Sequence, residues 1–130
     1  MTLLLALLMC AAVKTHEAVP PDFELTRFLN CVEQKEQYGE GNRYGITEAT
    51  WKQHMKDRPY SDAQDDFWCR LCAVKHTNYL ANALAHEGLP PSVYCVASAY
   101  HHGLAGFLAL AAAGKTSSYG TEIANLYREP

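Results

Sequence analysis

The fold is decided by residues 61–88, SDAQDDFWCRLCAVKHTNYLANALAHEG, the longest segment of the chain with the pattern of a helix. Apolar residues follow one another through it at helical intervals: Phe67, Trp68, Leu71, Cys72, Val74, Tyr79, Leu80 and Leu84. Ser61 suits an N-cap, because its hydroxyl can accept a hydrogen bond from a free backbone N–H, and Gly88 suits a C-cap. The stretch therefore predicts one long helix between Ser61 and Gly88.

The segments on either side also have helical patterns. Further helices are expected over about residues 22–38, 47–58, 90–103, 104–113 and 119–127. Asp22 and Thr47 are the candidate N-caps of the first two. No alternating strand pattern is longer than three residues, and there is no internal repeat or low-complexity linker. We therefore expect a compact all-α domain of about six helices.

Composition and charge narrow the class of protein. The chain has 130 residues, of which 48% are hydrophobic and 19% charged, as in ordinary single-domain globular proteins. Its formal net charge is -3, with 11 Lys and Arg against 14 Asp and Glu. Because this leaves no basic excess to neutralise a phosphate backbone, we expect no nucleic-acid partner.

The N-terminal segment indicates export. Residues Thr2 to Val13 read TLLLALLMCAAV, an apolar run too short to cross about 30 Å of hydrocarbon as a helix. We interpret residues 1–18 as a signal peptide and 19–130 as a single secreted domain, periplasmic if the source is bacterial, with no stable membrane association. Two alternatives stay open: a lipoprotein acylated at Cys10, and an N-terminal core helix.

The cysteines number five, and cleavage of the leader would remove Cys10. The four that remain are Cys31, Cys69, Cys72 and Cys95. In an exported chain of this size an even set predicts two disulfides, although the sequence leaves their connectivity open. Cys69, Cys72 and His76 also have a spacing that could serve zinc, and Cys69 and Cys72 could form a redox pair. Since no fourth ligand and no preceding strand are evident, we expect disulfides, no metal and no cofactor.

We expect the functional site in residues 31–51, CVEQKEQYGEGNRYGITEATW, where a predicted helix is followed by a glycine-rich turn. Glu33 and Glu36 lie one helical turn apart, and Gly39, Gly41 and Gly45 follow. A carboxyl group beside an apolar face can donate a proton near neutral pH, and glycines let the backbone approach a bulky ligand. Both features suit a sugar chain, although solvated glutamates beside a flexible loop would give the same pattern.

Four motifs carry a resemblance to a known superfamily. They are Cys31-Val32-Glu33, the turn GNRYGITEATW at 41–51, the stretch ASAYHHGLAG at 97–106, and TSSY at 116–119. Read in this order, the chain resembles the lysozyme-like superfamily, in its soluble lytic transglycosylase, goose-type lysozyme and resuscitation-promoting-factor branches. The resemblance covers about residues 22–128 and implies an α-helical lysozyme-like domain with a cleft beside the glycine-rich turn.

The resemblance also implies roles for individual residues. It places the catalytic acid at Glu33, with Glu36 as the runner-up, and Tyr119 as the tyrosine that holds the catalytic carboxyl. Substrate-binding positions implied by the match, besides Glu36 and Tyr119, are Tyr44, Gly45, Ile46, Thr47, Tyr100 and His101. Glu40 in the turn is the candidate second carboxylate, and Glu48 is less suitable because it opens a helix. This sequence departs from the family at Gly45, where a glutamine is usual, and at His101, where an asparagine is usual.

Two functions are consistent with these residues. The first is a secreted, cofactor-free and monomeric glycosidase that cleaves the β-1,4-linked glycan of bacterial peptidoglycan, or less plausibly chitin, as a muramidase or a lytic transglycosylase. Such an enzyme degrades cell walls and can be antimicrobial. The second is a non-catalytic secreted protein that uses the same fold to bind glycan or to inhibit another enzyme. The sequence does not decide between hydrolysis and transglycosylation.

Overall fold

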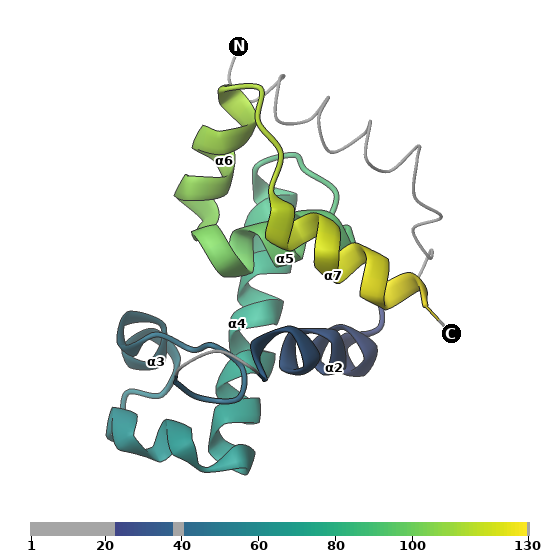
Figure 1. Ribbon diagram of the computed structural model, residues 1–130. Helices are drawn as coiled ribbons and strands as arrows, with labels where there is room; N and C mark the ends of the chain where they lie inside the picture. Colours follow the sequence, from purple (N-terminus) through teal and green to yellow (C-terminus); the bar gives the residue numbers. More distant parts are fainter. Residues whose placement is uncertain (1–22, 38–40, 130) are drawn as a thin grey trace.

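The computed structural model describes residues 23–37 and 41–129, and all regular structure in these ranges is helical. In chain order the elements are α2 (Leu25–Glu36), α3 (Glu48–His54), the 3-10 helix η1 (Tyr60–Gln64), α4 (Asp66–His86), α5 (Val93–His102), α6 (Leu104–Ala112) and α7 (Ser118–Arg128) (Figure 1). The prediction of an all-α chain with about six helices is thus confirmed for the described residues.

Side-chain caps begin several of these helices. Thr47 Oγ1 accepts a hydrogen bond from the Thr50 backbone N–H at 3.3 Å, as predicted for the N-cap of α3. Ser92 Oγ caps α5 by accepting from Cys95 N–H, and Ser117 Oγ caps α7 by accepting from Gly120 N–H. Because each cap satisfies a backbone donor that has no partner inside its helix, the short polar residues fix where the helices start.

The long helix starts later than the sequence indicated. Its N-cap is Asp65, whose carboxylate Oδ1 accepts from the backbone N–H groups of Phe67 at 3.0 Å and Trp68 at 3.3 Å. Ser61 lies inside η1 instead, so its prediction as the cap is wrong. Aspartate and serine are about equally suited to an N-cap, and here the folded chain places the Asp65 carboxylate where it accepts two N–H groups at the positive end of the helix. The helix ends as predicted before Gly88, whose φ of +76° suits glycine.

The helices pack around α4 and α5. In Figure 1, α4 runs through the middle of the molecule, with α3 and η1 near its N-terminal end and α5, α6 and α7 toward its other end. Helix α5 packs against α4, α6 and α7, and all residues from Val93 to Ala99 are buried. Helix α2 packs against α4 and α7. This arrangement places the end of α2 beside the turn that precedes α3.

The cysteines differ from the prediction. Cys31, Cys69 and Cys72 are free and buried, so two disulfides among the four expected cysteines cannot form in this structure. Cys69 uses its thiol in another way, because Sγ donates a hydrogen bond to Oδ1 of Asn42 at 3.3 Å. Burial raises the pKa of the Cys72 thiol to about 11 and also raises that of Cys69, so both thiols stay protonated at neutral pH. These thiols behave as core residues rather than as cross-links.

Most of the other N-terminal predictions are not addressed by these residues. The leader (residues 1–18) and Cys10 lie outside the described ranges, as does Asp22. The N-cap of α2 is Glu24, so the prediction of Asp22 as the cap is wrong. Within those ranges no single helix is long and apolar enough to cross a membrane. Helices α5 and α6 together have the length and composition, but they are bent by 111° where they meet.

Candidate functional site

The turn that leads into α3 is held by one buried asparagine. Asn42 Oδ1 accepts from the Ile46 N–H at 2.7 Å, and Asn42 Nδ2 donates to the Ile46 carbonyl at 2.7 Å. The side-chain amide thereby pairs with the backbone of Ile46 through a donor and an acceptor, as a neighbouring strand would. Asn42 is only 7% exposed, so breaking this pair would leave buried polar groups without partners. Asn42 is not among the residues that the sequence motifs predicted for the site.

Gly45 brings this turn against the end of α2. Its φ is +65°, a left-handed conformation that glycine adopts without strain. A Cβ atom at this position would lie 2.8 Å from both Cδ and Oε1 of Glu36. The absence of a side chain at Gly45 therefore leaves the space that the Glu36 carboxyl group occupies.

Tyr119 holds the Glu36 carboxyl from the other side. The Tyr119 hydroxyl donates a hydrogen bond to Glu36 Oε1 at 3.2 Å, across 83 positions of sequence. Burial raises the pKa of Tyr119, and the charge of Glu36 and this hydrogen bond raise it further. The hydroxyl consequently stays protonated and acts as a donor. Helix α7 thus supplies the group that orients a carboxyl on α2.

A pocket of about 270 Å³ lies beside this carboxyl group. Six residues predicted for the site line it: Glu36, Gly45, Ile46, Thr47, Tyr100 and His101. Thr50 and His76 complete the lining, and sequence reasoning had not placed either in a substrate site. Glu36 supplies the only carboxyl group among these lining residues. The pocket is therefore a largely polar cavity with one candidate acid.

Tyr100 and His101 join α5 to the same site. The Tyr100 hydroxyl donates to the Tyr44 carbonyl at 2.6 Å, which ties α5 to the turn. Burial raises the pKa of Tyr100 well above its ordinary value, so this donor also keeps its proton. The His101 ring stacks on the Tyr119 ring, with centroids 4.4 Å apart and planes within 6°. Tyr119 is thereby packed from one face while its hydroxyl reaches Glu36.

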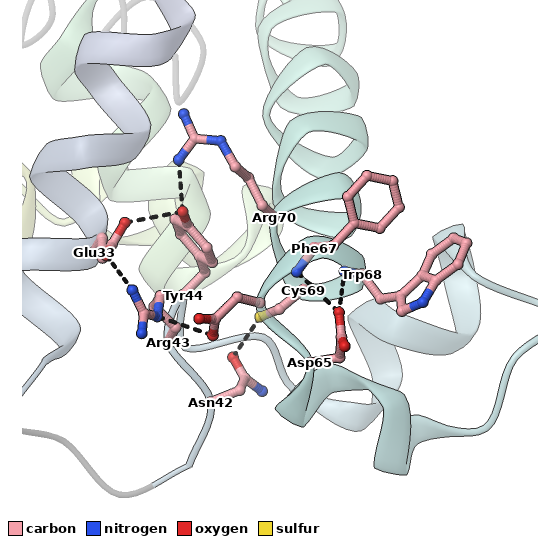
Figure 2. Close-up of polar contacts among 10 residues, drawn as sticks. Glu33, Asn42, Arg43, Tyr44, Asp65, Phe67, Trp68, Cys69 and Arg70 are labelled. Atoms are coloured by element: carbon pink, nitrogen blue, oxygen red, sulfur yellow. Dashed lines mark hydrogen bonds and ion pairs between the residues drawn. The ribbon is translucent and has the colours of Figure 1, made fainter.

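Glu33 lies in a different environment. Its Oε1 pairs with Arg43 Nη1 at 2.8 Å, and its Oε2 accepts from the Tyr44 hydroxyl at 3.0 Å (Figure 2). Arg70 Nη1 donates to that same hydroxyl at 2.6 Å, and Arg43 Nε also contacts Asp66 at 3.0 Å. Both oxygens of Glu33 are therefore engaged in a network that joins α2, the turn and α4.

Glu33 does not line the 270 Å³ pocket, but it lines a second one of about 260 Å³. Glu36 lines both, together with Asn42 and Arg43 in the second pocket. Of the two glutamates, Glu36 is thus the one whose carboxyl stands between two cavities. Glu33 instead contacts Arg43 and Tyr44, two residues of the turn that also bond to α4.

The remaining predicted candidates take up other positions. Glu40 lies outside the described residues, and Glu48 is the first residue of α3, where it pairs with Lys52 at 3.2 Å. The described part of the chain contains no group of three or more His, Cys, Asp or Glu side chains that could hold a metal ion. The only carboxyl that the structure brings to the larger pocket among its lining residues is Glu36.

The arrangement as a whole can perform acid–base chemistry. A single carboxyl, oriented by a protonated tyrosine and next to an open polar cavity, can give a proton to a bound leaving group and later take one back.

Comparison of the chain with protein-family models, with curated proteins and with solved structures gave no match. The assignment of a function therefore depends on the geometry of these residues and on the sequence motifs that contribute them.

Proposed function

We propose that this protein cleaves the β-1,4-linked glycan of bacterial peptidoglycan, with Glu36 as the general acid. One observation carries the proposal: three of the four motifs that resemble the lysozyme-like superfamily, far apart in sequence, meet around the carboxyl of Glu36, which lies one helical turn after the Glu33 of the fourth motif. The end of α2 supplies the carboxyl, the glycine-rich turn supplies Gly45, α5 supplies His101 and α7 supplies Tyr119. We propose on this basis that the domain is lysozyme-like and that it acts outside the cytoplasm.

Glu36 replaces Glu33 in this proposal for a geometric reason. An acid must be within hydrogen-bonding reach of the glycosidic oxygen, which requires a carboxyl that faces a cavity. Glu36 lines both pockets, whereas the oxygens of Glu33 are occupied by Arg43 and by the Tyr44 hydroxyl. The Tyr119 contact, which the resemblance assigns to the catalytic carboxyl, is also made to Glu36.

We propose transglycosylation as the form of cleavage. Glycoside hydrolysis by most enzymes uses two carboxyl groups that flank the bond, whereas transglycosylation needs one, and Glu36 is the carboxyl among the described residues that line the larger pocket. With a single carboxyl, Glu36 protonates the glycosidic oxygen as the bond to C1 breaks, and the leaving sugar departs with that proton. The C6 hydroxyl of the muramyl residue then attacks C1 and returns its proton to Glu36, which yields a 1,6-anhydro end and restores the acid.

The test compares two glutamate variants on the same helix. Wild type, Glu36→Gln and Glu33→Gln are incubated with purified peptidoglycan sacculi, and turbidity and released fragments are followed by mass spectrometry. We expect clearing by wild type with anhydro ends, loss of at least 100-fold in rate for Glu36→Gln, and retention of most activity by Glu33→Gln.

Three outcomes would change the proposal. Equal clearing by Glu36→Gln would remove Glu36 as the acid, and reducing ends would identify a hydrolase. Binding of sacculi by wild type without release of fragments would replace the enzyme by a glycan-binding protein. Far-UV circular dichroism of each variant separates loss of chemistry from loss of fold.

A further inference from the structure

Two histidines on different helices form a pair at the wall of the larger pocket. His54 is the last residue of α3 and His76 lies in the middle of α4, and their ring nitrogens Nε2 and Nδ1 are 2.9 Å apart. His76 lines the pocket and is 8% exposed. Sequence reasoning considered His76 only as a zinc ligand and did not consider His54.

The distance between the two nitrogens restricts their protonation. At 2.9 Å one nitrogen must carry the proton and the other must accept it, because two facing N–H groups would repel. The rings of Tyr79 on α4 and Tyr100 on α5 pack against His76, with centroids 6.2 Å and 5.5 Å away. The pair couples the two tautomers: when His54 Nε2 donates, the proton of His76 sits on Nε2, and when His76 Nδ1 donates, Nε2 of His76 is an acceptor.

Burial and the charge of Lys75 oppose protonation of the pair. Burial lowers the pKa of His54, and the charge of Lys75, whose Nζ reaches the His54 carbonyl at 3.5 Å, lowers it further. Burial and His54 lower the pKa of His76 to about 4. Glu36 from α2 and His101 from α5 line the same pocket as His76. At neutral pH His76 is therefore an uncharged imidazole.

The second ring nitrogen of His76 remains available to the pocket. His76 Nδ1 is engaged by His54, and no hydrogen bond within the described residues uses its Nε2. Nε2 is also not among the buried polar atoms that lack a partner, a set in which only Thr77 Oγ1 appears for the described residues. A polar atom that is neither buried nor bonded, on a residue that lines a cavity, is placed to meet a ligand.

We infer that His76 contacts the glycan through Nε2, and that His54 is a positioning residue that sets whether this nitrogen donates or accepts. The inference rests on the proposed function and extends it. The group it recognises is a hydroxyl or acetamido group of the sugar that occupies the larger pocket. Chemistry at Glu36 needs no proton from His76, so its contribution lies in binding and orienting that sugar.

The first arm of the test does not depend on activity. Nitrogen-15 spectra of the histidine rings are recorded for wild type, His54→Leu and His54→Gln, with His86→Gln as an exposed control on α4. We expect the ring-nitrogen shifts of His76 to change in His54→Leu, to return toward the wild-type values in His54→Gln, whose amide can replace Nε2, and to stay unchanged in His86→Gln. Ring-nitrogen shifts of His76 that are the same in wild type and in His54→Leu would refute the pairing.

The second arm measures kcat and KM on soluble peptidoglycan strands. We expect His76→Leu to raise KM at least tenfold with a smaller change in kcat, His54→Leu to raise it less, and His54→Gln to restore it. An unchanged KM for His76→Leu in an active enzyme overturns the inference and leaves the proposed function intact. Failure of wild type to bind or cleave the strands overturns both, and equal unfolding midpoints exclude misfolding as the cause.

Discussion

The contact between Gly45 and Glu36 gives the sharpest test of the site. In Gly45→Ala the new methyl group would lie 2.8 Å from the Glu36 carboxyl carbon, closer than nonbonded atoms can remain. Glu36 is a flexible side chain, so its carboxyl can swing away from the methyl group. By moving, it would lose the hydrogen bond from the Tyr119 hydroxyl and leave its place beside the pocket.

The size of the effect can be separated into two parts. Alanine at a left-handed φ costs about 1–2 kcal/mol of folding free energy, and this part is independent of Glu36. Gly88→Ala supplies the matched control, because Gly88 has a φ of +76° and a Cβ there would meet nothing within 4 Å. Loss of the bond from Tyr119 adds about 1–3 kcal/mol for Gly45→Ala only. Displacement of the acid by about 1 Å is expected to lower the rate roughly 100-fold.

The assay combines urea unfolding with clearing of sacculi for wild type and both variants. We expect both variants to be destabilised, Gly45→Ala more strongly, and only Gly45→Ala to lose activity. Equal activity of Gly45→Ala and Gly88→Ala at equal stability would refute the reasoning, since it would show that the carboxyl need not occupy the space beside Gly45.

Three further predictions concern the groups around this contact. Tyr119→Phe should lower the cleavage rate about tenfold, since it removes one hydrogen bond to the acid, whereas Tyr127→Phe in the same helix should leave the rate unchanged; initial rates on sacculi check this. Stability should fall as pH drops from about 6.5 to about 4, because the pKa of His76 is about 4 when folded and near 6.5 when unfolded, so the unfolded chain binds more protons in that window. His76 should contribute about 3 kcal/mol to this fall, so the fall should be smaller by that amount in His76→Leu, as urea titrations at several pH values would show. Asn42→Asp keeps an acceptor for the Ile46 N–H but removes the donor to its carbonyl, and should cost about 1–3 kcal/mol of unfolding free energy by urea denaturation.

The helices could be predicted from local sequence because their start signals are local. Thr47 acts as an N-cap through contacts three residues away, and Gly88 ends α4 through its own backbone conformation. The same logic misplaced the start of α4, because Ser61 and Asp65 are both acceptable caps and only the folded chain selects the aspartate. Local sequence patterns therefore predicted reliably that a helix exists, and less reliably at which residue it begins.

The candidate site was predictable in its components but not in its assembly. Glu33 and Glu36 are one turn apart, and which of them meets the pocket depends on how the turn folds back onto α2. The pairs Tyr119 with Glu36 and His54 with His76 join residues 83 and 22 positions apart, and no local pattern carries such information.

The cysteine prediction is wrong for a related reason. An even set of cysteines in an exported chain indicates pairing only if their side chains meet. Cys31 is buried on α2, while Cys69 and Cys72 are buried on α4, and all three keep free thiols. Cys69 donates its hydrogen bond to Asn42 instead of to a second sulfur. The number of cysteines in the sequence does not show that these three thiols are buried in the core.

The hydrogen bonds of the turn between α2 and α3 have a consequence for how the protein unfolds. Several of its hydrogen bonds come from distant helices: from Cys69 on α4 to Asn42, from Tyr100 on α5 to the Tyr44 carbonyl, and from Tyr60 in η1 to the Ile46 carbonyl. These contacts form only when the surrounding helices have docked, so the wall of the pocket depends on the packing of those helices. Local opening of this loop is coupled to global unfolding, so the Ile46 amide should exchange its proton with solvent as slowly as the slowest amides of the core.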